Sequence, residues 1–270
     1  MQVPGATHVS VLLNRGGKQT QTTDWLADEV PVSLVFNGLS HAVMLATPLD
    51  IEDMAIGFAF TEGFLQRRAE LYGVEVETTP LGIEAQLEVS SACFARLKDR
   101  RRSLAGRTGC GLCGTESLEH VHLSPPPLRA RPAVQASAIA DALKAVQRFQ
   151  VLQRSTGAVH AAAWCDLSGS VLLCREDVGR HNALDKVIGA MLVRQVDPST
   201  GFLLVTSRAS FEMVQKTAMA GVSMLIAISA ATERAQRVAT GAGVCLVGFA
   251  RQSNFVAYTF PDRILFPRRG

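Results

Sequence analysis

Residues 202–249, FLLVTSRASFEMVQKTAMAGVSMLIAISAATERAQRVATGAGVCLVGF, decide the fold class of this chain. Apolar runs and stretches of helical spacing alternate within it: runs at 202–206, 223–229 and 244–249, separated by helical patterns at 211–220 and 233–240. Strands that are apolar along their whole length are buried on both faces, as in a parallel sheet covered by helices. Flanking segments continue the pattern: a strand at 171–174, a helix at 182–194 and a strand at 255–260. The C-terminal half is therefore predicted to be an α/β domain whose largely parallel sheet has helices on both faces.

A proline-rich connector divides the chain. Residues 124–133, SPPPLRARPA, contain four prolines in ten positions, which neither a helix nor a central strand tolerates. Before the connector we expect mixed elements: hairpin strands at 32–37 and 41–47, a helix capped by Asp50 and running to about Gln66, and strands at 74–77 and 82–89. After it, Ser137 is expected to cap a helix whose apolar positions extend to Phe149. The sequence thus predicts two domains, residues 1–130 (α+β) and 131–270 (α/β).

The composition excludes several classes of protein. The chain has 270 residues, 27 of them basic and 24 acidic, with 47% apolar and 19% charged, which argues against wholesale disorder. Six cysteines in this length do not make a disulfide scaffold. The longest apolar stretch, near 222–231, is too short to cross a membrane, and no secretory signal pattern opens the chain. We therefore expect a cytoplasmic protein with reduced thiols and no membrane partner.

The sharpest local motif is the cysteine pair in TGCGLCG at 108–114. Glycines around Cys110 and Cys113 allow the backbone to turn freely and leave the sulfurs accessible. The preceding residues, 96–107, carry six basic groups and one acidic group, whereas the whole chain has a net charge of only +3. Nearby cations favour the nucleophilic thiolate, so the pattern indicates a reactive thiol at one electropositive place.

Several interpretations of this motif remain open on spacing alone. Together with His120 and His122 the pair could ligate zinc; it could equally be a dithiol redox switch, a carrier of transferable sulfur, or two ordinary cysteines beside a solvated basic run. The basic run by itself is also compatible with an RNA-binding module, which would bind with a strong dependence on salt concentration. The other cysteines are expected to be inert packing residues: Cys93, Cys165, Cys174 and Cys245.

A second polar motif, REDVGRHNALDK at 175–186, falls where a strand ends and a helix begins. Ligands of open α/β sheets bind at this edge, near helix N-termini. Arg180, Arg208 and Arg251 follow three different strands, and we expect them to converge on an anionic ligand such as a phosphate. The alternative is a network of salt bridges at the surface that caps helices. His160, in a segment of small residues, is by itself more typical of a hydrogen-bonded core histidine.

Together these motifs resemble the formate dehydrogenase accessory sulfurtransferase family, FdhD/NarQ. The resemblance covers about residues 30–260 and rests on GCGLCG (109–114), TGAVHAA (156–162), EDVGRHNALDKVIG (176–189), SRASFEMVQKTAMAG (207–221) and GFAR (248–251). It implies a sulfur carrier that accepts persulfide sulfur from a cysteine desulfurase. It further implies transfer to the molybdenum (or tungsten) bis-molybdopterin guanine dinucleotide cofactor of formate dehydrogenase. Cys110 would bear the persulfide and Cys113 would assist its release.

The same resemblance assigns a cofactor site and a fold. It implies that the cofactor, or GDP as a mimic, is bound by Phe249, Ala250, Arg251, Gln252, Ser253 and Asn254 with Arg208, Arg180, His181 and His160, and that the protein has no catalytic metal of its own. It implies a cytidine-deaminase-like three-layer α/β/α C-terminal domain, a smaller N-terminal α+β domain, and a homodimer without nucleic-acid partners. Ala158 and Asn254 depart from glycine and arginine in the family pattern. Deamination is disfavoured, because no glutamate follows His160 in an H-x-E motif. The rival function is a zinc or redox-switch protein that binds a nucleotide without transferring sulfur.

Overall fold

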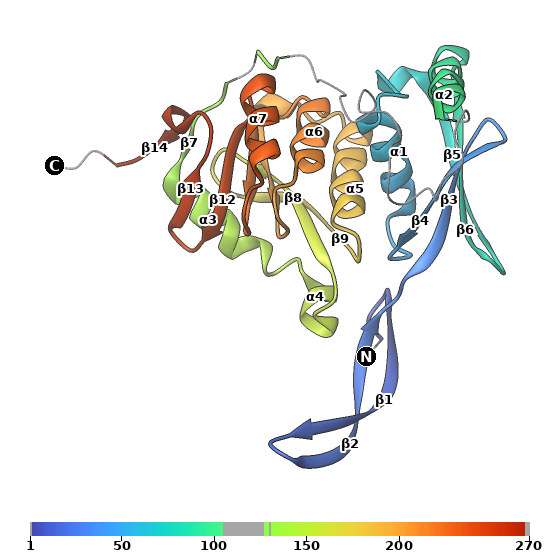
Figure 1. Ribbon diagram of the computed structural model, residues 1–270, viewed down its shortest axis with the longest axis vertical. Coiled ribbons are helices and arrows are strands. Elements are labelled where there is room, and N and C mark those ends of the chain that lie inside the picture. Colours follow the sequence, from blue (N-terminus) through green and yellow to red (C-terminus); the bar gives the residue numbers. More distant parts are fainter. Residues whose placement is uncertain (1, 105–126, 130, 268–270) are drawn as a thin grey trace.

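The computed structural model describes residues 2–104, 127–129 and 131–267. Its largest sheet has six strands in the order β13-β12-β11-β10-β8-β9 (Figure 1). Their bounds are β8 (His160–Asp166), β9 (Val171–Asp177), β10 (Gly201–Val205), β11 (Met224–Ala227), β12 (Cys245–Arg251) and β13 (Asn254–Ala257). Within this sheet β10 pairs in parallel with β11, and β11 with β12, whereas the β8–β9, β8–β10 and β12–β13 pairs are antiparallel. Four of the six strands therefore run in one direction, and the expectation of a largely parallel sheet is wrong for β8 and β13, which run in the other direction. The cause is local: β8 and β9, like β12 and β13, are joined by short turns, which impose antiparallel pairing.

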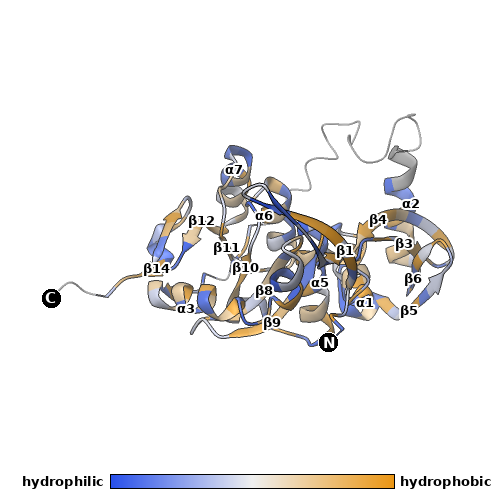
Figure 2. Cartoon of the chain, turned by 90° about the horizontal axis from the view of Figure 1, so that it is seen from below, coloured by the Kyte–Doolittle hydropathy of each residue, from blue (hydrophilic) through white to orange (hydrophobic). Residues whose placement is uncertain are grey.

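Helices cover both faces of this sheet. One face packs on α3 (Ala136–Val146), and the other packs on α5 (Arg180–Val193), α6 (Phe211–Met219) and α7 (Glu233–Ala242). The alternation of side chains along each strand produces this division, since Leu203 and Val205 join the core under α5–α7 whereas Phe202 and Leu204 join the core under α3. Figure 2 shows the strands between these layers mainly in the colours of apolar residues. The apolar runs of the sequence are thus the buried centre of the fold.

The N-terminal part has its own sheet, in the order β4-β3-β6-β5, with a separate apolar core. Its elements are β3 (Val30–Phe36), β4 (Leu39–Ala46), α1 (Ile51–Thr61), β5 (Leu71–Thr79), β6 (Gly82–Val89) and α2 (Ser91–Leu104). The predicted hairpin and the two later strands are confirmed. The helix ends at Thr61, five residues earlier than expected, because Gly63 takes a left-handed backbone with φ of 77°. Asp50 does not cap it with its side chain; the Asp50 carboxylate lies 3.3 Å from Arg175 Nε instead.

Two glycines bring α1 and α5 into close contact. A Cβ atom at Gly57 would overlap the carbonyl oxygen of Asp185, and one at Gly189 would overlap the carbonyl oxygen of Asp53. The helices therefore cross with their backbones almost touching (Figure 1), which larger side chains would prevent. This crossing joins the N-terminal sheet to the C-terminal one.

Several elements were missed in the sequence. The hairpin of β1 (Ala6–Arg15) and β2 (Lys18–Ala27) projects from the body (Figure 1), and α4 (Val151–Thr156) precedes β8. Short strands β7 (Val134–Gln135) and β14 (Ile264–Leu265) pair in parallel. The described residues also form the 3-10 turns η1 (Arg68–Glu70), η2 (Pro198–Thr200) and η3 (Pro261–Arg263). Ser137 lies inside α3, whose N-cap is Gln135, and Phe149 lies beyond the end of that helix. Within the described ranges, no helix is long and apolar enough to cross a membrane.

Candidate functional site

The predicted ligand residues lie along one edge of the six-stranded sheet. His160 begins β8 beside Asp177 at the end of β9, Arg208 follows β10, and Arg251 ends β12. Strands are about 4.8 Å apart, so the ends of β10 and β12 are separated by roughly 10 Å, with β11 between them. The structure therefore brings these residues to the same edge but arranges them as a row. A row suits an extended anionic ligand with several phosphates better than a single phosphate.

The N-termini of α5 and α6 open onto this edge without side-chain caps. Gly179 and Ser210 are the two N-cap residues, and neither supplies a capping hydrogen bond from its side chain. Exposed N–H groups at a helix start attract anions. Among the described residues, the buried Nε of Arg180 and the buried Oγ of Ser210 also have no hydrogen-bond partner. Unpaired buried donors are costly, so this corner of the edge is chemically suited to an anion.

His160 is held in its neutral form at the same corner. Burial lowers the pKa of its imidazole, and the positive charge of the neighbouring Arg180 lowers it further. An uncharged His160 leaves the guanidinium of Arg180 as the positive group that faces a ligand here. His160 has features of both sequence-based hypotheses. It is half-buried, like a core histidine, and it lies at the strand end near Arg180, like a ligand residue.

The segment from Phe249 to Asn254 is distorted where the resemblance implies cofactor binding. The register of β12 and β13 shifts between Gly248 and Arg251, and Phe249 and Gln252 adopt left-handed backbones with φ of 51° and 56°. Bulges of this kind turn side chains away from the normal alternation. Phe249, Arg251, Gln252, Ser253 and Asn254 are exposed as a result, whereas Ala250 is buried in the core under α3. Ala250 therefore contributes backbone atoms and packing, not a side chain, to any ligand site.

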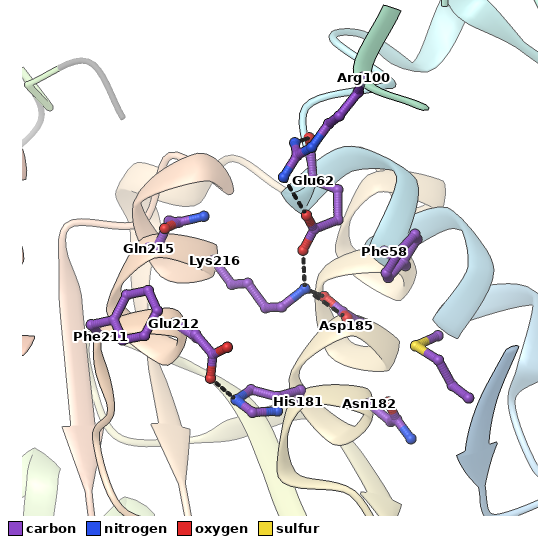
Figure 3. Close-up of a pocket in the computed structure, with 11 residues that line it drawn as sticks. Phe58, Glu62, Arg100, His181, Asn182, Asp185, Phe211, Glu212, Gln215 and Lys216 are labelled. Atoms are coloured by element: carbon purple, nitrogen blue, oxygen red, sulfur yellow. Dashed lines mark hydrogen bonds and ion pairs between the residues drawn. The ribbon is translucent and has the colours of Figure 1, made fainter. Parts of the chain in front are cut away.

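A cavity of about 240 Å³ opens between α1, α2, α5 and α6, next to this edge (Figure 3). Its wall combines apolar and charged side chains from both parts of the chain: Met44, Phe58, Glu62, Arg100, His181, Asn182, Asp185, Phe211, Glu212, Gln215 and Lys216. His181 is the predicted ligand residue that lines it, and its Nε2 lies 2.8 Å from Glu212 Oε2. The His181 imidazole holds the pKa of the Glu212 carboxyl below its usual range.

A chain of ion pairs crosses the cavity wall. Lys216 Nζ donates to Thr61 Oγ1 at 2.9 Å and to Asp185 Oδ2 at 2.9 Å, and lies 3.3 Å from Glu62 Oε1. Glu62 also accepts from Arg100 at 3.1 Å (Figure 3). Burial by itself would lower the pKa of Lys216, but the negative charge of Asp185 outweighs it and raises the pKa, so the ammonium stays charged. Sequence reasoning missed these cavity residues, although Glu212 and Lys216 stand four apart in the quoted SRASFEMVQKTAMAG motif, the spacing of one helix face.

Much of the REDVGRHNALDK motif proves to be internal. Asp177 is fully buried and accepts from Lys186 Nζ at 2.6 Å, from Asn182 Nδ2 at 3.0 Å and from the Thr47 amide at 3.0 Å. Burial lowers the pKa of Lys186. This network ties the start of α5 to the end of β4. These residues therefore do form a polar network, as the alternative predicted, but the network lies at an internal interface and not at the surface. Arg180 and His181 remain at the edge of the sheet.

The first part of the basic run is a paired helix face. Arg96 NH2 lies 2.5 Å from Glu70 Oε2, Arg100 pairs with Glu62, and Lys98 stands 4.2 Å from the centre of the Phe94 ring. The basic excess predicted for residues 96–107 is thus partly offset in α2, because Arg96 and Arg100 are each paired with a glutamate. Cys110 and Cys113, with His120 and His122 of the zinc alternative, lie outside the described residues. Among the residues that are described, no group of three or more His, Cys, Asp or Glu side chains is placed to hold a metal ion.

The other four cysteines have the inert character expected of them. Cys93, Cys165 and Cys245 are buried, and Cys174 is half-buried in β9. Burial raises the pKa of each thiol, to about 12 for Cys174 and about 11 for Cys245. At neutral pH these thiols remain protonated, so they are poor nucleophiles and poor metal ligands.

Comparisons with known proteins agree with the motifs. The FdhD/NarQ family model matches residues 27–265. A protein from Variovorax paradoxus, named sulfur carrier protein FdhD, is 59% identical over 241 residues, which cover 89% of this chain and 87% of that protein. A protein of the same name from Cupriavidus necator is 53% identical and covers 93% of this chain and 87% of its own length. A crystal structure from Desulfotalea psychrophila, described as a formate dehydrogenase accessory protein, superposes with a TM-score of 0.76 at 21% identity, covering 97% of this chain and all of that one, and so shares the fold. The chain belongs to the FdhD/NarQ family.

Proposed function

We propose that this protein is a sulfur carrier that supports formate dehydrogenase, as the names of its relatives indicate for them. The observation that carries the proposal is that the chain retains GCGLCG at 109–114 within a matched family pattern of residues 27–265. The remaining cysteines are disqualified by burial and raised pKa values. Cys110 and Cys113 are therefore the cysteines that we propose for sulfur transfer.

Two balanced thiol steps describe the proposed transfer. The Cys110 thiolate attacks the terminal sulfur of a persulfide on a cysteine desulfurase. The sulfur–sulfur bond of that persulfide breaks, the cysteine of the desulfurase leaves as a thiolate, and Cys110 becomes a persulfide. The Cys113 thiolate then attacks the inner sulfur of that persulfide, so that a Cys110–Cys113 disulfide forms and hydrosulfide departs toward the cofactor. A cellular dithiol must reduce the disulfide before the next cycle. This cycle needs a reducing compartment, so the cytoplasm is part of the proposal.

The sheet edge is the proposed binding surface for the substrate cofactor, the molybdenum or tungsten bis-molybdopterin guanine dinucleotide. Its support is the row of Arg180, Arg208 and Arg251, the uncapped starts of α5 and α6, and the unpaired Nε of Arg180. The cavity beside it links this edge, through His181, to Arg100 of α2, and α2 ends six residues before Cys110 in the sequence. The division at residue 130, the cytidine-deaminase-like layering and the homodimer also remain predictions within this proposal.

Mass spectrometry after incubation with a cysteine desulfurase and cysteine tests the transfer. We expect one added sulfur on the peptide that contains Cys110, its loss in Cys110→Ala, and its accumulation in Cys113→Ala, which lacks the releasing thiol. Cys174→Ala, which removes an inert thiol, is the matched control and should load like the wild type. Loading of the Cys110→Ala variant at the wild-type level would overturn the mechanism. Near-stoichiometric zinc that disappears in the same variant would support the rival zinc protein.

Calorimetry with GDP tests the binding surface. We expect saturable binding that weakens at least tenfold in Arg208→Ala and in Arg251→Ala, because each loses a charge-assisted contact to phosphate. Arg237→Ala is the control, since that exposed arginine on α7 pairs only with Glu233 of its own helix among the described residues. Unchanged affinity in both edge variants would reject the edge as the nucleotide site.

A further inference from the structure

The β1–β2 hairpin lacks the packing that a two-stranded ribbon needs. Its ten cross-strand pairs run without a break from Ala6↔Ala27 to Arg15↔Lys18, yet none of its residues is buried. An isolated two-stranded hairpin is marginal in water, and three or more strands are normally required. The hairpin also lies almost wholly before the residues that the family model matches, 27–265. The hairpin therefore lacks the additional strands that would stabilise it, and it calls for a partner that supplies them.

The two strands differ in what they offer to that partner. β2 is polar and lies near α4 of the body of the protein. β1 carries Val9, Val11, Leu12 and Leu13, with Leu12 57% exposed, and apolar colours mark the ribbon at its label in Figure 2. Between Ala6 and Asn14, β1 has no acid, lysine, arginine or proline, and its pairing with β2 shows no bulge. Monomeric proteins protect an exposed strand edge with such devices, and β1 has none of them.

We propose that the hairpin is a dimerisation arm, in which the free edge of β1 pairs antiparallel with β1 of a second copy of this chain. The result is a four-stranded sheet, β2-β1-β1-β2, which satisfies the strand number that each hairpin lacks. Val9, Val11 and Leu13 alternate onto one face, so two copies form a continuous aliphatic surface there. The inference rests on the homodimer of the proposed function and identifies the surface that makes it.

The absence of charged residues from the centre of β1 favours a second copy as the occupant. About a two-fold axis each residue of β1 faces another residue of the same strand in the second copy. This pairing brings no like charges together at the centre, because the central residues of β1 are uncharged. With the axis near Ser10, the basic residue Arg15 of one copy lies opposite Gly5 of the other. The two basic tips, each with Arg15 and Lys18, then point to opposite ends of the new sheet and do not repel one another.

Sedimentation velocity over a range of concentrations tests the arm. We expect a dimer for the wild type, and at least a tenfold weaker dimer for Val9→Lys/Val11→Lys and for Val9→Glu/Val11→Glu, in which like charges meet across the axis. An equimolar mixture of the two variants should regain the dimer, because opposite charges then meet. Thr20→Lys/Thr22→Lys is the matched control: it adds the same charge to the same hairpin face, but on β2, and should leave the dimer intact.

Each result has a distinct meaning. Unfolding of the body is detected by circular dichroism and is not expected, since the hairpin contributes no residue to the three described cores. A dimer of unchanged strength in both β1 variants would overturn the arm, and a monomeric wild type would overturn the homodimer as well. Failure of the mixture to regain the dimer would reject self-pairing of β1. Persulfide loading of Cys110 is measured separately, so none of these outcomes is confused with failure of the sulfur-carrier proposal.

Discussion

Lys216 shows at the scale of one residue how this chain tolerates buried charge. The residue is 6% exposed, and its ammonium contacts Thr61, Glu62 and Asp185. Removing one member of a buried pair leaves an uncompensated charge. Lys216→Met should therefore lower the free energy of unfolding in urea by about 3–5 kcal/mol. Lys216→Met/Asp185→Leu should recover a substantial part of this loss, and equal destabilisation of the single and double variants would refute the pairing argument.

His160 should give the protein a measurable pH dependence. Its pKa is lowered below the ordinary value of 6.5 in the folded state, so the unfolded chain takes up a proton first as the pH falls. The unfolded state then binds more protons, and the stability from a neutral His160 is lost as the pH drops below about 6.5 toward the folded pKa. The slope of unfolding free energy against pH in that window should be shallower in His160→Asn. Identical slopes for the two proteins would show that His160 is not perturbed.

The polar residues of α5 explain which part of the site could be predicted. The spacing of Asn182, Asp185, Lys186 and Gly189 follows the i, i+3, i+4, i+7 pattern and places them on one face of the helix. Apolar residues on such a stripe signal burial, but polar ones signal a surface, so the sequence suggested ligand contacts. Only the facing oxygens of Thr47 and Thr61, more than 120 positions away in the chain, identify the stripe as internal.

At the scale of elements, the close contact between α1 and α5 is the feature most sensitive to substitution. Gly57→Ala places a methyl group against the backbone of Asp185, and forcing extra volume into such a contact costs about 1–3 kcal/mol. Gly241→Ala in α7 is the matched control, because nothing lies within 4 Å of a Cβ there. It should be neutral or stabilising by up to about 1 kcal/mol, as helix propensity predicts. Thermal unfolding of the two variants distinguishes them, and equal effects would mean that the helices adjust freely.

Elements were predictable where apolar residues mark a repeating face. The alternating pattern from 202 to 249 gave β10, α6, β11, α7 and β12 close to their observed bounds. α2 was missed because its apolar seam, Cys93 and Leu97, is hidden among six charged residues. The hairpin was missed because β2 is threonine- and glutamine-rich and shows no alternation of apolar and polar residues. Strand direction depended on turn length, which the apolar pattern does not encode.

At the scale of the whole molecule, the two parts should unfold together. Thr47 and Thr61 on the N-terminal side hold hydrogen bonds to Asp177 and Asp185 on the C-terminal side. In a Trp25→Phe background, fluorescence of Trp164 reports the C-terminal core and alkylation of Cys93 reports the N-terminal core. Their urea midpoints should coincide. Two separated transitions would show that the predicted boundary at residue 130 divides independent folding units.

The helix crossing also implies a delay during synthesis on the ribosome, because its two helices are translated far apart in time. α1 is complete at residue 61, but the helix that covers it ends at residue 193. At 5–20 residues per second, its apolar side waits for roughly 7–26 s before that helix has been made. The GCGLCG segment is translated within this interval. Nascent chains should therefore be vulnerable to aggregation and to premature thiol chemistry until the last third of the protein emerges.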